Sequence, residues 1–105
     1  MDMITEVTDN YVREAEVDYI GLWQIPAYFK KHLRLESDSE IKEKTFLVIQ
    51  NLMKHGILPG NLAEKGGFTF WQGSPDELFA RVESEWPKQG IPRLDYSGCW
   101  FALKK

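Results

Sequence analysis

Two histidines and a single cysteine are the side chains of this chain best suited to chemistry near neutral pH. His32 and His55 could carry protons or bind a metal ion, and Cys99 could act as a nucleophile. Neither histidine has a second ligand three or four residues away, and the motifs HExxH and CxxC are both absent. Cys99 has no basic residue directly beside it and lies in an expected strand, which favours a buried structural thiol.

Phosphate chemistry and acid–base chemistry also lack a pattern. The glycines at 56, 60, 66, 67 and 73 do not form GxGxxG or a Walker loop. Carboxylate pairs such as Glu83 with Glu85 are ordinary on solvated surfaces. We therefore predict a protein that is not an enzyme, with no catalytic residue, no metal and no cofactor.

Length and composition define the class of protein. The chain has 105 residues and a mass of 12.2 kDa, which is enough for one domain over residues 1–105. Its hydrophobic content of 43% is that of a globular protein. No run approaches about 18 apolar residues, the start has no signal-peptide pattern, and one cysteine allows no internal disulfide. These features predict a cytoplasmic protein without a membrane span.

Acidic residues are concentrated at the start of the chain. Residues 1–18 hold six acids against Arg13 alone, a net charge of −5, whereas the whole chain has −3. The segment 1–17 is thus an acidic N-terminal segment, with a short helix expected from Thr8 to Val17 and Thr8 as its N-cap. Such a segment is commonly a solvated surface, and the alternative is an electrostatic guide toward a basic partner.

Cap residues predict the main helices. A helical apolar pattern begins at Asp18, and Pro26 predicts a kink or a restart near Gln24. Ser37 to Glu40 is a capping box before a helix that ends at Gly56. Ser74 to Glu77 opens the third helix in the same way, with Leu78, Phe79, Val82 and Trp86 on its inner face.

Strands are expected mainly in the last third of the chain. Residues 68–71 and 99–103 are the two clearest strands, and we expect them to lie beside each other. Residues 56–67 read as a loop, with a short strand at Ile57 and Leu58. The predicted fold is a helix-rich α+β domain, with about three main helices and a small C-terminal sheet of two or three strands.

Several motifs together resemble a known family. They are Asp18-Tyr19, Leu22-Trp23, His55-Gly56-Ile57-Leu58-Pro59-Gly60, Trp71, Gly73-Ser74-Pro75, Glu85-Trp86, Gly90, Pro92 and Gly98-Cys99-Trp100-Phe101. In this pattern, over roughly residues 18–102, the chain resembles a family of small bacterial proteins of unknown function. Members of that family resemble immunity proteins of polymorphic toxin systems, including contact-dependent growth inhibition. Pro26 and the acidic leader depart from the family pattern.

The resemblance implies an immunity protein, or antitoxin, that binds a toxin domain and covers its active site. The expected toxin is a basic ribonuclease, because an enzyme that grips RNA presents cations to phosphate. The alternatives are a winged-helix-like nucleic-acid-binding domain and another regulatory interaction module. Tryptophans are expected mainly in the core, with Trp71 the one best placed to reach an interface. The candidate partner-binding residues are Glu14, Glu16, Asp18, Glu36, Asp38, Glu40, Glu43 and Trp71.

Overall fold

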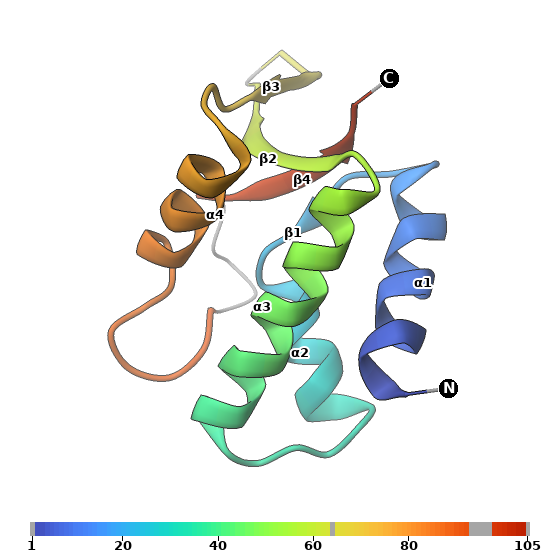
Figure 1. Ribbon diagram of the computed structural model, residues 1–105, viewed down its shortest axis with the longest axis vertical. Coiled ribbons are helices and arrows are strands. Elements are labelled where there is room, and N and C mark those ends of the chain that lie inside the picture. The colour runs from blue at the N-terminus through green and yellow to red at the C-terminus, as the bar shows by residue number, and fades with distance from the viewer. Residues whose placement is uncertain (1, 64, 93–97, 105) are drawn as a thin grey trace.

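A computed structural model describes residues 2–63, 65–92 and 98–104 of the chain. Within these ranges the helices are α1 (Met3–Ala15), α2 (Gln24–Lys31), α3 (Asp38–Lys54) and α4 (Pro75–Ser84), and the strands are β1 (Ile20–Gly21), β2 (Ile57–Leu62), β3 (Phe68–Phe70) and β4 (Trp100–Leu103). The predicted α+β class is confirmed. Figure 1 shows α1, α2 and α3 below the sheet and α4 at its side. None of the described helices is long and apolar enough to cross a membrane.

The two predicted serine caps are present. The Ser37 hydroxyl accepts a hydrogen bond from the Glu40 amide at 3.3 Å, at the start of α3. At α4 the capping box is complete, because Ser74 Oγ accepts from the Glu77 amide at 3.2 Å and Glu77 Oε1 accepts from the Ser74 amide at 2.9 Å. The Ser74 amide stabilises the ionised carboxylate and so lowers the pKa of Glu77.

The first helix starts earlier than predicted. Asp2, not Thr8, is its N-cap, and Asp2 Oδ1 accepts from the Thr5 amide at 2.9 Å. Thr8 lies within α1 and its hydroxyl donates to the Ile4 carbonyl at 2.7 Å. The N-cap of a helix is the residue whose side chain accepts a hydrogen bond from an amide of the first turn, and in α1 this residue is Asp2.

The second helical stretch begins at Gln24. Pro26 lies in the first turn of α2, where amide groups have no acceptor within the helix, so it causes no kink. The preceding residues Ile20 and Gly21 form β1, which was not predicted. The helical pattern expected from Asp18 therefore holds only from Gln24 onward.

The sheet has the strand order β1-β4-β2-β3 and is antiparallel throughout. The predicted neighbours β3 and β4 do not pair, because β2 lies between them. The short strand expected at Ile57 and Leu58 is present, and it continues to Leu62 where a loop was expected. Pro59 has no amide hydrogen, yet it costs β2 no hydrogen bond to β4. The N and O atoms of a strand residue point to the same side, and those of Pro59 point toward β3, because Pro59 O accepts from the Trp71 amide just past the end of β3.

The core lies between one sheet face and the helices. Register and alternation place Ile20, Ile57 and Phe101 on this face, and each is at most 1% exposed. Phe29 of α2 and Leu52 of α3 are fully buried in the same cluster. Of the residues predicted for the inner face of the third helix, Leu78 and Val82 of α4 are buried, Trp86 is buried just past the end of α4, and Phe79 is half-buried. Phe79 packs edge-on against Phe46, with ring centroids 5.6 Å apart.

Thr45 is an unsatisfied polar group in this core. Its side chain is 0% exposed, and its hydroxyl has no hydrogen-bond partner among the described residues. We expect Thr45→Val to raise the free energy of unfolding by about 1–3 kcal/mol, because the same shape is kept and an unpaired hydroxyl leaves the core. Urea denaturation monitored by circular dichroism measures the change.

Thr8 provides the matched control for this substitution. It is also buried in a helix, but its hydroxyl donates to Ile4 and accepts from Asn51 Nδ2 at 3.4 Å. Thr8→Val should therefore lower stability. Equal shifts of the two urea midpoints in the same direction would contradict this account of Thr45.

Candidate partner-binding surface

The candidate acidic residues form two groups at opposite ends of the molecule. Glu14, Glu16 and Asp18 follow the C-terminal end of α1, next to β1, and we call them the acidic turn. The other four, Glu36, Asp38, Glu40 and Glu43, lie around the start of α3. A helix of 17 residues is about 25 Å long, and α3 leads from these residues toward the sheet (Figure 1). The two groups therefore do not form one continuous patch.

The backbone holds the acidic turn in a defined shape. The amides of Val17 and Asp18 donate to the Glu14 carbonyl at 3.0 and 2.9 Å. Asp18 Oδ1 accepts from the Tyr19 amide at 2.7 Å, which ties the end of the turn to the start of β1. Val17 at its tip is 85% exposed. The turn thus presents three exposed carboxylates and an exposed apolar side chain on an ordered backbone.

The position of these acids is unfavourable for the helix that carries them. The C-terminal end of a helix has a partial negative charge, so carboxylates there are destabilising. Glu14 lies in the last turn of α1, and Glu16 is its C-cap. None of the three carboxylates makes an ion pair with any described residue, and the nearby Arg13 donates instead to Asn10 Oδ1. Apart from the hydrogen bond that Asp18 accepts from the Tyr19 amide, folding does not explain why acids stand here.

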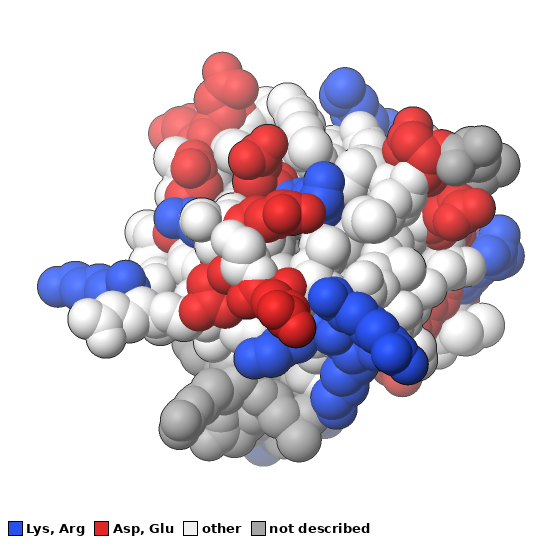
Figure 2. Space-filling view, turned by 90° about the horizontal axis from the view of Figure 1, so that it is seen from below, with Lys and Arg blue, Asp and Glu red and all other residues white. Residues whose placement is uncertain are grey.

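The acids at the start of α3 have a simpler explanation. Asp38 and Glu40 occupy the first turn of the helix, where the dipole favours negative charge. Figure 2 shows this end of the molecule, with acidic and basic side chains directly beside one another. Mixed charge of this kind gives little net field, and the helix dipole alone accounts for Asp38 and Glu40. The acidic turn, unlike the start of α3, therefore has negative charge that no helix dipole favours.

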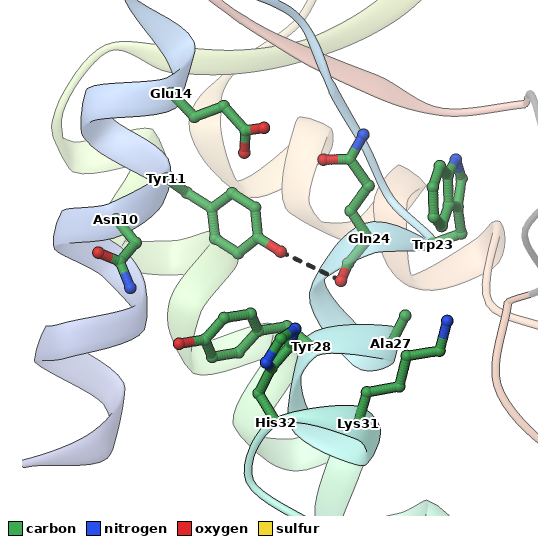
Figure 3. A pocket seen from close by; sticks show the side chains of 9 residues that line it. All are labelled: Asn10, Tyr11, Glu14, Trp23, Gln24, Ala27, Tyr28, Lys31 and His32. Atoms are coloured by element: carbon green, nitrogen blue, oxygen red, sulfur yellow. Dashed lines mark hydrogen bonds between the residues drawn. The ribbon is translucent and has the colours of Figure 1, made fainter.

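A pocket of about 370 Å³ lies between α1 and α2, beside the acidic turn (Figure 3). Glu14 lines one side of it, and Tyr11 donates across it to the Gln24 carbonyl at 3.1 Å. Burial, and secondly the negative charge of Glu14, raise the pKa of Tyr11, so its hydroxyl stays a donor. Tyr28 and His32 stack at the opposite wall, with ring centroids 4.8 Å apart.

The titratable side chains among the described lining of this pocket are those of Tyr11, Glu14, Tyr28, Lys31 and His32. It has one histidine and no cysteine or serine. No group of three or more His, Cys, Asp or Glu side chains anywhere in the described ranges is arranged to hold a metal ion. The two histidines lie at the ends of different helices. His32 is the C-cap of α2, and His55 is the C-cap of α3, with its Nδ1 2.9 Å from the Asn51 carbonyl oxygen.

Trp71 does not reach the surface in the way the sequence suggested. It is 7% exposed, and its Nε1 donates to Asn61 Oδ1 at 2.6 Å. The Arg81 guanidinium lies over the ring, 3.9 Å from its centroid. Trp71 therefore lies at the edge of the core, with its ring contacts inside the fold.

Cys99 is buried with 0% exposure. Burial, followed by the charge of Glu85, raises the pKa of its thiol to about 12, although Arg81 acts in the opposite direction. A protonated, inaccessible thiol is a poor nucleophile. The structural interpretation of Cys99 agrees with this environment.

Exposed apolar side chains were not predicted as part of the site. Besides Val17, they include Tyr19 at 37% and Leu62 at 40% exposure. Tyr19 packs on Phe68 of β3, with ring centroids 5.2 Å apart. Alternation along Phe68-Thr69-Phe70 puts the two phenylalanines on one face of the strand and Thr69 on the other. It does not show which of these faces the helices leave uncovered.

Comparisons with protein-family models, with curated proteins and with solved structures find no match to this chain.

Proposed function

We propose that this protein binds a toxin domain with a basic surface and neutralises it by covering its active site. The observation that carries this proposal is the acidic turn, with three exposed carboxylates that make no ion pair with described residues and that oppose the dipole of α1. Charged groups that cost folding stability and have no ion-pair partner among the described residues are characteristic of binding sites. Such an inhibitor acts in the cytoplasm and needs no reaction, metal or cofactor.

A ribonuclease domain is the partner that best fits this charge. An enzyme that holds RNA presents lysine and arginine side chains to the phosphates, so an acidic surface can occupy the same groove. The ordered backbone of the turn favours binding, because little conformational entropy is lost when it docks. The exposed side chain of Val17 adds apolar contact area in the middle of the charges.

The first test of this proposal is genetic. A gene immediately upstream that encodes a large secreted protein with a variable toxin tail supports it, and an unrelated upstream gene counts against it. The toxin domain encoded there then serves as the binding partner in the experiments that follow.

The second test neutralises the acidic turn with Glu14→Gln, Glu16→Gln and Asp18→Asn together. We expect association with the toxin domain to slow by about tenfold or more at low salt, because electrostatic steering is lost. The difference from the parent should shrink near 1 M salt, where charges are screened within about 3 Å. Stopped-flow fluorescence measures the rates, and growth of cells that express the toxin measures protection.

The matched control removes the same charge at the start of α3 with Glu36→Gln, Asp38→Asn and Glu40→Gln. The two variants should move stability in opposite directions, by about 0.3–1 kcal/mol for each residue that interacts with a helix dipole. The turn variant should gain stability and lose binding, whereas the control should lose stability and keep most of its binding. Full protection by the turn variant would overturn the proposal.

A further inference from the structure

One face of the sheet carries aromatic side chains, and none of the helices in the described residues lies over it (Figure 1). Since Ile20, Ile57 and Phe101 face the helices, alternation places Tyr19, Leu62, Phe68 and Phe70 on the opposite face. We call these four residues the aromatic face. The rings of Phe68 and Phe70 contact each other at 4.8 Å between centroids, and Tyr19 joins them through Phe68.

Gly60 allows Phe68 to lie across the sheet. Gly60 is buried at the middle of β2, and a Cβ atom built there would lie 2.6 Å from Phe68 Cε1. The ring therefore rests on the glycine backbone and extends toward Tyr19. This arrangement keeps the three rings in contact with one another while a large part of Tyr19 and Leu62 stays open to solvent.

The surroundings of the aromatic face favour a cation. Lys104 Nζ lies 5.6 Å from the centroid of the Phe70 ring, within the range of a cation–π contact, so this end of the face already has its own cation and a further cation is favoured only at the Tyr19 end. At the Tyr19 end, the next residue back along the chain is Asp18 of the acidic turn, which is exposed. An exposed ring beside carboxylates attracts a positively charged group both through the ring face and through the negative charge.

We propose that the aromatic face binds arginine side chains of a basic protein partner, as the apolar continuation of the acidic turn. This inference rests on the proposed function, because it takes the same basic partner. Arginine fits better than lysine, since its planar guanidinium is weakly hydrated and stacks on aromatic rings. The chain itself uses this contact on the other side of the sheet, where Arg81 covers Trp71.

Octa-arginine and octa-lysine peptides are suitable probes, because they have the same charge and differ only in the side-chain head group. Titration of the full chain is followed by amide chemical shifts in nuclear magnetic resonance spectra at one fixed low salt concentration. We expect octa-arginine to bind about two- to fivefold more tightly than octa-lysine. The largest shift changes should include Tyr19, Leu62 and Phe68.

Two variants test the surface itself. Tyr19→Leu keeps an apolar side chain without the ring, and it should reduce the preference for arginine to about one. Leu62→Asn should weaken octa-arginine binding, whereas Leu47→Asn should not, although Leu47 on α3 has a similar exposure of 43%. Circular dichroism shows whether each variant is folded, and amide shifts of the core should match those of the parent.

Several results would overturn this inference. Equal binding of both peptides, with shifts confined to residues 14–18, would leave the acidic turn and the proposed function intact but remove the aromatic face. A dimer that Leu62→Asn dissociates in sedimentation experiments would show that a second copy occupies the face. Tighter binding of a single-stranded oligoribonucleotide at Tyr19 would assign the rings to base stacking instead.

Discussion

Replacement of Phe101 by alanine is expected to lower the free energy of unfolding by about 3–5 kcal/mol. Phe101 is fully buried and pairs on one side with Ile20 and on the other with Pro59, so its ring lies at the centre of the sheet's core face. Removal of the ring leaves a cavity that the paired strands cannot close. Urea denaturation followed by tryptophan fluorescence measures the loss.

Phe79→Ala is the control for this prediction. It deletes the same ring from a half-buried position on α4, where the main ring contact is Phe46. We expect a clearly smaller loss than for Phe101→Ala, since water can fill part of the space. Equal losses for the two variants would show that the described core is wrong.

Gly60→Ala is expected to destabilise the fold by about 1–3 kcal/mol through overpacking. The added methyl group would meet three atoms of β3, the Thr69 carbonyl oxygen and the Cε1 and Cζ atoms of Phe68. The carbonyl belongs to the neighbouring strand of the sheet and cannot rotate away as a side chain can. The change should therefore disturb both the β2–β3 pairing and the aromatic face.

A double variant separates these two contacts. Gly60→Ala combined with Phe68→Ala, compared with Phe68→Ala alone, should recover only part of the loss, because the contact with the Thr69 carbonyl remains. Full recovery would assign the whole effect to the ring. Stability of Gly60→Ala equal to that of the parent would contradict the close packing of β2 on β3.

Helix signals that act within one turn were readable from the sequence. Ser37 and Ser74 were recognised as caps because a cap hydrogen bond joins residues only three positions apart. The same reasoning failed at Thr8, since an aspartate six residues earlier also satisfies the rule and adds a longer helix. Local rules locate a helix well, but they do not choose between two acceptable starts.

Strand partners could not be predicted in the same way. β1 has two residues, which is too short to produce a recognisable alternation, and β2 contains Pro59 and Gly60, which both indicate a loop. Their strand conformation depends on hydrogen bonds to β4, whose residues lie about 40 to 80 positions away in the chain. The predicted pairing of β3 with β4 was wrong for this reason.

The sequence by itself determined the class of fold, the two serine helix caps and the amount and location of negative charge, because each follows from composition or from neighbours within a turn. Only the tertiary structure decided which carboxylates have no ion pair among the described residues and which aromatic rings have no described helix over them. The acidic turn is distinguished from the start of α3 by its place at a helix C-terminus. Tyr19 and Phe68 are nearly fifty residues apart in the chain. They share a face only because β4 and β2 join β1, which follows Tyr19, and β3 in one sheet.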